Sequence, residues 1–565
     1  MHKRTLPSPR KALRRFIRRQ DGTLLVFSLL LFSIFFLMSG MAADLMRVEN
    51  RRTALSQTLD RCALNGAALR QTLDPETVVR DCVNRENLLP FLTGVTVTNG
   101  TGQRSVEAIG DMTVDTLFMG ASGVDEIDIA ARSVAEQRAT NIEIVMALDV
   151  SGSMNSNSRI TGLQTAARNF VSTVLANNTN RISIAMVPYN GQVNLGPALA
   201  AKYNITHQPG LGTTANGNMA TVNCVDMPAS VYGTTGISRS LAMPATGWVD
   251  AFSTLGSFPS THSTSGMTPN GGNVWCPPST SNIVRMPDDN ITALHSYINA
   301  LNAIGATSIN AGMKWAGALL DPQARSVINE FVDTGVVPAE FVDRPFDYSR
   351  RDMLKIIVLM SDGENFGDVR LNDDYRTGLS PIFRGTDGNL SIRFLSGRPA
   401  AAGTNEFWVP HIDSNTSSSG SEGQWRATSW GGTSSTAGVQ LTWQQVWQHA
   451  TPSWVAWHLY ARALGTNSTT RTTTYNTWFA NFRTQRGTST STPAMDEELN
   501  DICTLTKSQG VLIYSVAFSA PTRGQNTLRA CASSTGHYFN STSNAALNAA
   551  FQAIATNITQ LRLIN

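Results

Sequence analysis

Residues 141–149 read Asn-Ile-Glu-Ile-Val-Met-Ala-Leu-Asp and run directly into Val-Ser-Gly-Ser at 150–153. This apolar run is typical of a strand that is buried on both faces of a parallel sheet. Similar runs follow at residues 181–188, 354–360 and 511–517, and helical patterns occupy 160–175, 291–304, 309–320, 495–508 and 544–561. The alternation predicts an α/β fold, a doubly wound and mostly parallel sheet with right-handed crossovers.

Oxygen-bearing side chains stand at the ends of these predicted strands and at one loop between them: Asp149, Ser151, Ser153, Thr307 and Asp362. Because the carboxyl ends of parallel strands share one edge of a sheet, these segments are expected to converge. Carboxylates and hydroxyls without imidazole or thiolate favour Mg²⁺, with Mn²⁺ or Ca²⁺ as alternatives. Two carboxylates and three hydroxyls leave such an ion with a position for an outside oxygen, so a carboxylate from another protein could complete its coordination.

The five residues resemble the metal-ion-dependent adhesion site (MIDAS) of von Willebrand factor type A (VWA) domains, which reads D-x-S-x-S, then a Thr, then an Asp after a later strand. The resemblance implies a Rossmann-like VWA domain over residues 141–565. It also implies that Ser151, Ser153 and Thr307 bind the metal directly, while the two aspartates bind it directly or through water. The alternative is ordinary turn chemistry, since Asp and Ser also cap helices.

The N-terminus combines a basic tail with an apolar segment. Residues 1–21 hold eight Lys or Arg and one acid, and residues 22–43 carry no formal charge. At about 1.5 Å per residue the apolar segment can cross a bilayer as a helix. The positive-inside rule then leaves the tail in the cytoplasm and the rest of the chain across the membrane. A cleaved signal peptide is the alternative, but its apolar region is usually shorter.

A helical stalk is expected over residues 44–73 and a small α+β module over 74–140. The stalk is indicated by apolar residues at helical spacing, namely Leu45, Val48, Leu55, Leu59, Cys62, Leu69 and Leu73. Asp74 and Pro75 are typical of a helix start. Val95–Thr98 followed by Asn99-Gly100 predicts a β-hairpin.

Two stretches, residues 189–288 and 365–493, are rich in Gly, Ser, Thr and Asn and interrupt the α/β alternation. They are expected to be insertions that fold onto the body. Eight of the 11 tryptophans lie between positions 408 and 478. Trp443, Trp447, Trp454 and Trp457 have helical core spacing, which favours an internal core over an exposed surface for glycans or a partner. His449 and His458 lack the spacing of metal ligands.

The six cysteines contain no C-x-x-C motif, which argues against zinc ribbons and thioredoxin chemistry. Disulfides in an exported body are the better interpretation, and buried free thiols are the alternative. Six cysteines allow about 15 connectivities, so pairing by proximity is only a hypothesis. It would join Cys62 to Cys82, Cys224 to Cys276 and Cys503 to Cys531.

Charge and motifs argue against two classes of function. The net charge is +3 and most of the basic excess lies in the tail, so a nucleic-acid binder is not expected. The common serine-hydrolase, phosphate-loop, dinucleotide and zinc-protease motifs are absent from the sequence. Ser151 has no histidine placed to act as its base, so an enzyme is the less favoured class.

The chain has, in order, a basic tail, an apolar helix, a helical continuation (Ala42-Ala43-Asp44-Leu45, Ala67-Ala68-Leu69), a short strand region and the C-terminal Cys531-Ala-Ser-Ser with Tyr538-Phe539. This order resembles that of the TadG-like proteins of bacterial Flp (tight-adherence) pilus assembly. Prepilin-like relatives have Glu five residues after the Gly cleavage site. Phe27 stands at that place after Gly22, which favours an uncleaved anchor.

The resemblance implies a single-pass inner-membrane protein with a cytoplasmic N-terminus and a periplasmic body. Its partner would be a pilus or secretion component that offers an acidic residue to the metal. A surface adhesin that binds host or matrix ligands through the same site is the alternative.

Overall fold

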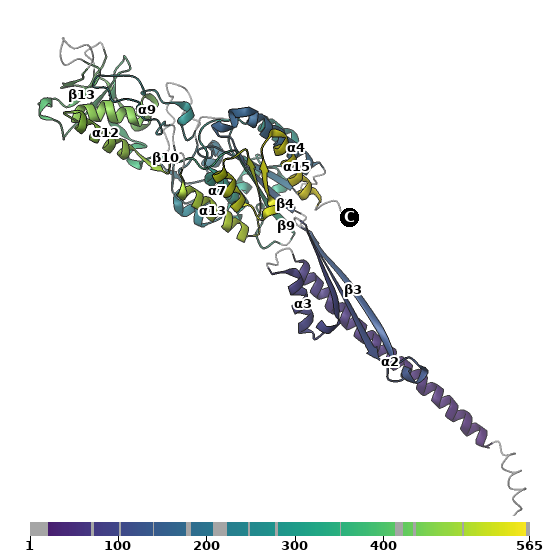
Figure 1. Cartoon of the computed structure of the whole chain (residues 1–565). Coiled ribbons are helices and arrows are strands. Elements are labelled where there is room, and N and C mark those ends of the chain that lie inside the picture. Colours follow the sequence, from purple (N-terminus) through teal and green to yellow (C-terminus); the bar gives the residue numbers. More distant parts are fainter. Residues whose placement is uncertain are drawn as a thin grey trace, which may run out of the picture. The chain divides into compact units, whose positions relative to one another are not determined.

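The computed structural model describes residues 21–68, 73–100, 103–138, 141–176, 182–206, 223–246, 249–276, 281–350, 352–412, 422–432, 437–488 and 491–560. The predicted tail, residues 1–21, lies outside this range except for Asp21. The chain divides into two compact units, Met1–Arg138 and Ala139–Asn565. Each unit is described by itself (Figure 1).

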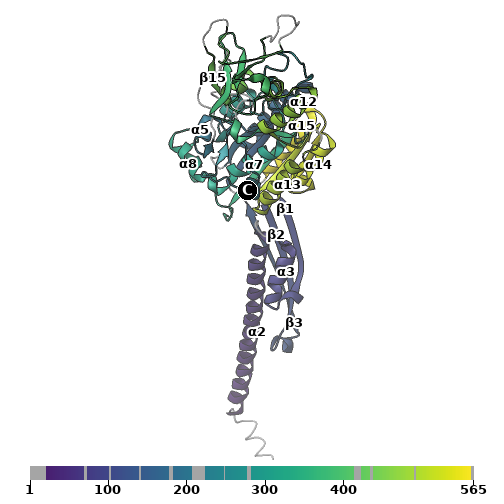
Figure 2. The same ribbon diagram turned by 90° about the vertical axis from the view of Figure 1, so that its left-hand side faces the viewer.

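The first unit is built on one long helix, α2 (Asp21–Ala67), which joins the predicted membrane segment to the predicted stalk without a break as far as Ala67. A three-stranded antiparallel sheet lies along it, formed by β1 (Leu92–Gly100), β2 (Gln103–Asp115) and β3 (Glu126–Arg138) (Figure 2). Short 3₁₀ turns precede β1 (Leu89–Phe91) and connect β2 to β3 (Met119–Ser122). The expected hairpin is therefore present.

The core of this unit forms where α2 and α3 (Pro75–Arg85) pack on the sheet. Leu55, Leu59 and Cys62 of α2 are fully buried together with Val79 and Val83 of α3. The predicted helix start is confirmed, because the Asp74 carboxylate accepts the Thr77 amide at 2.9 Å. Two members of the predicted stripe do not join the core, since Leu45 is 53% and Leu73 is 64% exposed. Leu69 lies outside the described residues.

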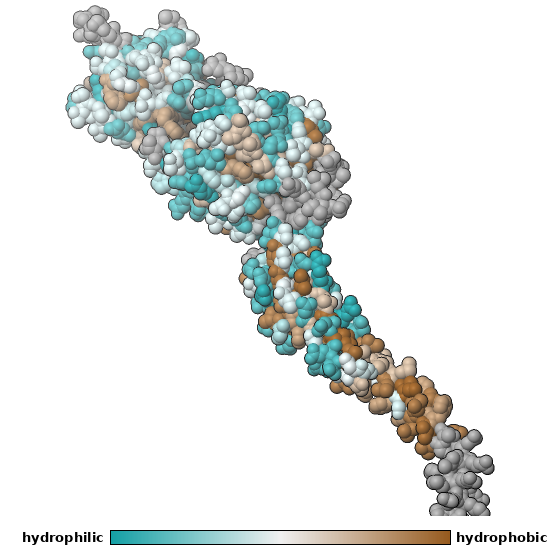
Figure 3. All heavy atoms as spheres, turned by 45° about the vertical axis from the view of Figure 1, so that its right-hand side comes forward, coloured by the Kyte–Doolittle hydropathy of each residue, from teal (hydrophilic) through white to brown (hydrophobic). Residues whose placement is uncertain are grey.

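The N-terminal half of α2 exposes almost all of its apolar side chains, seen as the brown surface in Figure 3. Of the described helices, α2 contains the stretch that is long and apolar enough to cross a membrane. A soluble helix with this surface would leave apolar area in water, which is unfavourable by about 25 cal/mol per Å².

The largest sheet of the second unit has the order β18-β17-β9-β4-β5-β8. Its strands are β18 (Tyr538–Ser541), β17 (Leu512–Phe518), β9 (Met353–Ser361), β4 (Asn141–Asp149), β5 (Ile182–Tyr189) and β8 (Arg285–Asp288). The first five pair in parallel, whereas β8 pairs antiparallel to β5. Side chains of β4, β5 and β9 are buried almost throughout, which explains their continuous apolar runs.

Helices of the second unit pack on this sheet and on one another. They are α4 (Arg159–Leu175), α5 (Gly196–Ala200), α6 (Ile291–Asn299), α7 (Ile309–Leu320), α8 (Arg325–Asp333), α13 (Pro493–Ser508), α14 (Thr522–Cys531) and α15 (Asn544–Gln560). Helix α4 packs against α15 and α6, and α7 contacts β4, β5 and α13. The sequence patterns located α7 and α13 within two residues of their ends.

The fold class expected from the sequence, one doubly wound and mostly parallel sheet of the VWA type, is wrong. Among the described residues the strands form five sheets: the mixed six-stranded one, the sheet of the first unit, a five-stranded sheet and two strand pairs. The five-stranded sheet is antiparallel throughout, as is the pair β10 (Asp368–Leu371) with β16 (Arg483–Arg486). The chain is therefore a mixed assembly of parallel and antiparallel sheets.

The stretch 365–493 is the source of much of this difference, because it builds its own sheet and most of a second core, to which Val249, Ala251 and Trp275 of stretch 189–288 also contribute. The five-stranded sheet has the order β14 (Gln424–Arg426), β13 (Phe407–Val409), β12 (Leu390–Arg393), β11 (Leu379–Arg384) and β15 (Val439–Thr442). The helical segments beside it are α9 (Trp443–His449), α10 (Pro452–Trp454), a π-helical turn (Val455–Ala461), α11 (Arg462–Leu464) and α12 (Ser468–Phe482). Stretch 189–288 adds the short parallel pair β6 (Ile205–Thr206) and β7 (Met243–Pro244).

The tryptophans form the interior of this substructure, as their spacing predicted. Trp443, Trp447, Trp454 and Trp457 are all buried in one apolar cluster. The indole N–H groups of the last three donate to backbone carbonyls of Tyr375, Ser263 and Pro259 at 2.8–2.9 Å. The hypothesis of an exposed tryptophan surface is therefore not supported at these four positions.

The three disulfides predicted from proximity are present: Cys62–Cys82, Cys224–Cys276 and Cys503–Cys531. Each joins residues no more than 52 positions apart, so each closes a local loop within its own unit. The six cysteines of the sequence are thereby all paired.

Substitution of Trp447 tests the core formed by the buried tryptophans. Its side chain is 1% exposed and hydrogen-bonded, so Trp447→Ala should lower the free energy of unfolding by about 3–5 kcal/mol. Leu395→Ala is the control, because Leu395 is 71% exposed, and should change it by less than about 0.5 kcal/mol. Denaturant unfolding of the full chain, followed by circular dichroism, measures both; similar values would contradict a core role for Trp447.

Candidate functional site

The pairing of β4 with β9 brings the first and last of the predicted site residues together. Leu148 stands opposite Met360 in this parallel register, so both strands end at the same edge of the sheet. Asp149 closes β4, and Asp362 follows the last residue of β9, Ser361. Asp149 is fully buried and Asp362 is 3% exposed.

Hydrogen bonds connect four of the five predicted residues. The Ser151 amide donates to Asp149 Oδ1 at 2.8 Å, and the hydroxyls of Ser151 and Ser153 lie 2.9 Å apart. The Ser153 hydroxyl donates to Asp362 Oδ1 at 2.7 Å. Residues 213 positions apart in sequence thus share one polar cluster, which we call the oxygen cluster: Asp149, Ser151, Ser153 and Asp362.

Thr307 borders the oxygen cluster from a neighbouring loop. A Cβ added to Gly363, the residue after Asp362, would lie 3.4 Å from Thr307 Oγ1. The loop is held by backbone bonds, since the Gly152 amide donates to the Gly305 carbonyl and the Ile304 amide donates to the Val150 carbonyl, both at 2.8 Å. The structure therefore brings the third predicted segment next to the other two.

The electrostatics of the cluster are unbalanced toward negative charge. Burial, and then the neighbouring charge of Asp362, raise the pKa of Asp149 from 3.8 to about 7, although bonds from Ser151 and Ser361 act in the opposite direction. The same burial and the Asp149 charge raise the pKa of the buried Tyr189 hydroxyl. A positive ion at this place would lower the free energy of the ionised pair.

Two residues of the site were not predicted from the sequence. Ser361 donates its hydroxyl to Asp149 Oδ2 at 2.5 Å. Arg159, the first residue of α4, forms an ion pair with Asp362 Oδ2 at 2.7 Å. Ser361 could have been found from its place beside Asp362 at a strand end. Arg159 carries no motif, and only its closeness in sequence to Ser153 hints at its role.

The donors present suit a hard cation. Asp149, Ser151, Ser153, Thr307 and Asp362 offer only oxygen, which Mg²⁺, Mn²⁺ and Ca²⁺ prefer. No cluster of three or more His, Cys, Asp or Glu that could hold a metal occurs among the described residues. The oxygen cluster differs from such a cluster because it has two carboxylates and its other oxygens come from serine hydroxyls. Metal binding here stays a prediction.

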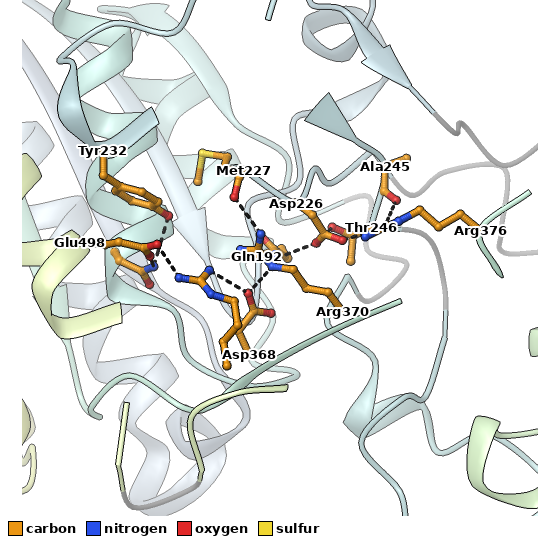
Figure 4. Close-up of polar contacts among 12 residues, drawn as sticks. Gln192, Asp226, Met227, Tyr232, Ala245, Thr246, Asp368, Arg370, Arg376 and Glu498 are labelled. Atoms are coloured by element: carbon orange, nitrogen blue, oxygen red, sulfur yellow. Dashed lines mark hydrogen bonds and ion pairs between the residues drawn. The ribbon is translucent and has the colours of Figure 1, made fainter. Parts of the chain in front are cut away.

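A second polar cluster, missed by the sequence analysis, lies where stretches 189–288 and 365–493 meet helix α13 (Figure 4). Three buried acids face three arginines. The pairs are Arg376 with Asp226 at 2.7 Å, Arg370 with Asp368 at 2.5 Å, and Arg486 with Glu498. Glu498 also accepts the Asn310 amide of α7 at 2.8 Å. Because each charge is matched, we interpret this cluster as a structural junction.

The raised pKa of Asp149 predicts a pH dependence of stability without added metal. The folded chain holds this proton more tightly than the unfolded chain, whose carboxyl titrates near 3.8, so the stabilising contribution is lost as pH rises through about 7. In chelator, the melting temperature of the wild type should therefore fall more steeply between about pH 5 and pH 8 than that of Asp149→Asn. The exposed Asp333→Asn is the control and should keep the wild-type slope. Equal slopes for all three proteins would show that Asp149 is already ionised at low pH.

Comparison with known proteins gives one family match and several distant structures. Residues 22–69 match the family model described as putative Flp pilus-assembly TadE/G-like. No curated protein matches this chain.

Three solved structures illustrate the structural comparison. They are the pilus adhesin SpaC from Lactobacillus rhamnosus GG (11% identity, TM-score 0.26), the vWF domain of the type V pili tip protein Mfa5 from Porphyromonas gingivalis (12%, 0.30) and the PilB minor pilin from Streptococcus sanguinis (12%, 0.27). The alignments cover 82%, 75% and 83% of this chain and 34%, 96% and 78% of those chains. The chain thus spans about a third of the SpaC structure. TM-scores of this size do not define a common fold. The family match is the finding that bears on identity, and the resemblance to TadG-like pilus-assembly proteins is confirmed over residues 22–69, which include nearly all of α2.

Proposed function

We propose that this chain is a membrane-anchored, pilus-associated protein whose body binds a partner protein through a divalent cation held at the oxygen cluster and Thr307. The pilus association is supported by the TadE/G-like match at α2. The metal-dependent binding is supported by one observation above all: two buried carboxylates and the hydroxyls of Ser151 and Ser153 lie within one hydrogen-bonded cluster.

In this proposal Asp149, Ser151, Ser153, Thr307 and Asp362 hold the ion, with Mg²⁺ as the first candidate. When bound, the ion supplies a Lewis-acid position for an acidic side chain of the partner. The chain's own residues orient the ligands: Ser361 and the Ser151 amide fix the two oxygens of Asp149, and Arg159 fixes one oxygen of Asp362. These contacts orient carboxylates and do not activate a nucleophile, so the proposal is binding and not catalysis.

The anchor in this proposal is the apolar half of α2, with residues 1–21 in the cytoplasm and the body in the periplasm. The exposed apolar surface between Leu24 and Met38 supports a membrane-spanning helix. An inner-membrane anchor favours a partner within the pilus machinery over the alternative of an external host or matrix ligand, because a tethered body does not reach the outside of the cell.

Metal binding is tested directly by equilibrium dialysis of the purified full chain with Mn²⁺. Asp149→Ala should abolish binding because it removes a charged ligand. Ser361→Ala should weaken binding by about 10–100-fold because Ser361 orients a ligand without being one. Asp333→Asn, at an exposed residue that ends α8 and is not among the five proposed ligands, should bind like the wild type.

The same variants test the partner. Recovery of the pilus subunit on immobilised full chain should fall with chelator and with Asp149→Ala, and return when Mg²⁺ is restored to the wild type. Equal recovery in every condition would remove the metal from the mechanism while leaving the pilus association intact.

Topology is tested with a reporter that is active only after export, such as alkaline phosphatase. Joined after the C-terminal residue it should be active, and joined ahead of the first residue it should be inactive, because the basic tail holds the N-terminus in the cytoplasm. The reverse pattern would overturn the proposed orientation.

A further inference from the structure

The loop between β2 and β3, residues 116–125, presents apolar side chains beside the apolar half of α2. Leu117 is 70% exposed and Val124 is 39% exposed. Large apolar side chains at a hairpin end cost free energy in water, and this cost calls for a partner. We call residues 116–125 the β2–β3 tip.

Asp44 fixes the β2–β3 tip to α2. Its carboxylate is 2% exposed and accepts the amides of Leu117, Phe118 and Met119 at 3.0, 2.7 and 2.8 Å. Asp44 directly follows the predicted membrane segment, residues 22–43. Because helix side chains lean toward the N-terminus, the carboxylate holds the tip alongside the end of that segment.

Phe118 extends the contact further into the segment. Its ring lies 5.8 Å from that of Phe36 in an edge-to-face arrangement. A Cβ added to Gly40 would lie 2.5 Å from the Phe118 ring, so the absence of a side chain at Gly40 makes room for it. Phe36 precedes Asp44 by eight residues, or about 12 Å of helix. The tip therefore lies at the level of residues that are expected inside the bilayer.

The backbone of the tip is largely satisfied from within, which is a requirement for polar groups in lipid. The Thr116 amide donates to the Asp125 carbonyl at 2.8 Å, and the Val124 amide donates to the Met119 carbonyl at 3.2 Å. The Thr116 hydroxyl donates to the Val124 carbonyl at 2.5 Å. Together with the three bonds to Asp44, these contacts satisfy many of the backbone polar groups of the loop.

We propose that the β2–β3 tip is a second membrane contact, which inserts Leu117 and Phe118 into the periplasmic face of the bilayer beside α2. This inference rests on the proposed membrane anchor. The occupant is lipid because the apolar surface of the tip continues that of the exposed helix, and a bilayer around the helix at this level also surrounds the tip. The exposed carboxylates of Asp115, just before the tip, and of Asp125, its last residue, would lie among the headgroups.

Site-specific labelling tests this contact in the full chain. All native cysteines are in disulfides, so a single introduced cysteine can be labelled selectively with bimane. The labelled positions are Leu117→Cys in the tip, Leu29→Cys in the anchor and Thr96→Cys on the same sheet, each at an exposed residue. The protein is placed in phosphatidylcholine nanodiscs with and without brominated acyl chains, which quench only labels within the lipid.

We expect brominated lipid to quench the Leu117 label nearly as strongly as the Leu29 label and to leave the Thr96 label unchanged. Quenching at Leu29 without quenching at Leu117 would overturn the proposal while the anchor stands, and would indicate that the tip contacts water or another protein. Absence of quenching at Leu29 would overturn the anchor itself and the inference with it. Val124→Cys provides a second tip position in case a label at Leu117 disturbs the loop.

Discussion

The parallel, in-register pairing of β4 with β9 is the constraint on which the site depends. It forces two carboxylates to the same buried edge, where burial, and then the repulsion between their charges, raise the pKa of Asp149. Four hydrogen-bond donors offset this repulsion. The Ser361 hydroxyl and the Ser151 amide donate to Asp149, and the Ser153 hydroxyl and Arg159 donate to Asp362. A buried like-charge pair is costly in an unliganded protein and is typical of functional sites.

The first unit is organised along one helix, α2, whose two halves have different surfaces. The first half of α2 is apolar on all sides, and the second half buries only one face against α3 and the sheet. Asp44 stands at the change between the two, and its carboxylate accepts hydrogen bonds from three backbone amides. A carboxylate that is only 2% exposed needs such donors because it has little water to solvate it.

The sequence was sufficient for the elements with long, strong periodicity. The buried runs of β4 and β9, the helices α7 and α13 and the cap at Asp74 lie where their patterns predicted them. The convergence of Asp149, Ser151, Ser153 and Asp362 followed from strand order. The fold class was wrong because β10 to β16 are only three to six residues long, too short for alternation to be seen among Gly, Ser and Thr. Arg159 was missed because a long side chain reaches a site that its own position does not reveal.

The paired charges of Figure 4 have an evolutionary consequence. Arg370, Arg376 and Arg486 come from the stretch 365–493, whereas Asp226 and Glu498 belong to neighbouring parts of the chain. Removing that stretch would leave both acids buried without a counterion. The resulting loss in free energy of unfolding would be far greater than that caused by removing a surface loop. The stretch 365–493 and the rest of the second unit therefore depend on each other. A homologue that lacks this stretch should also lack acids at the positions of Asp226 and Glu498.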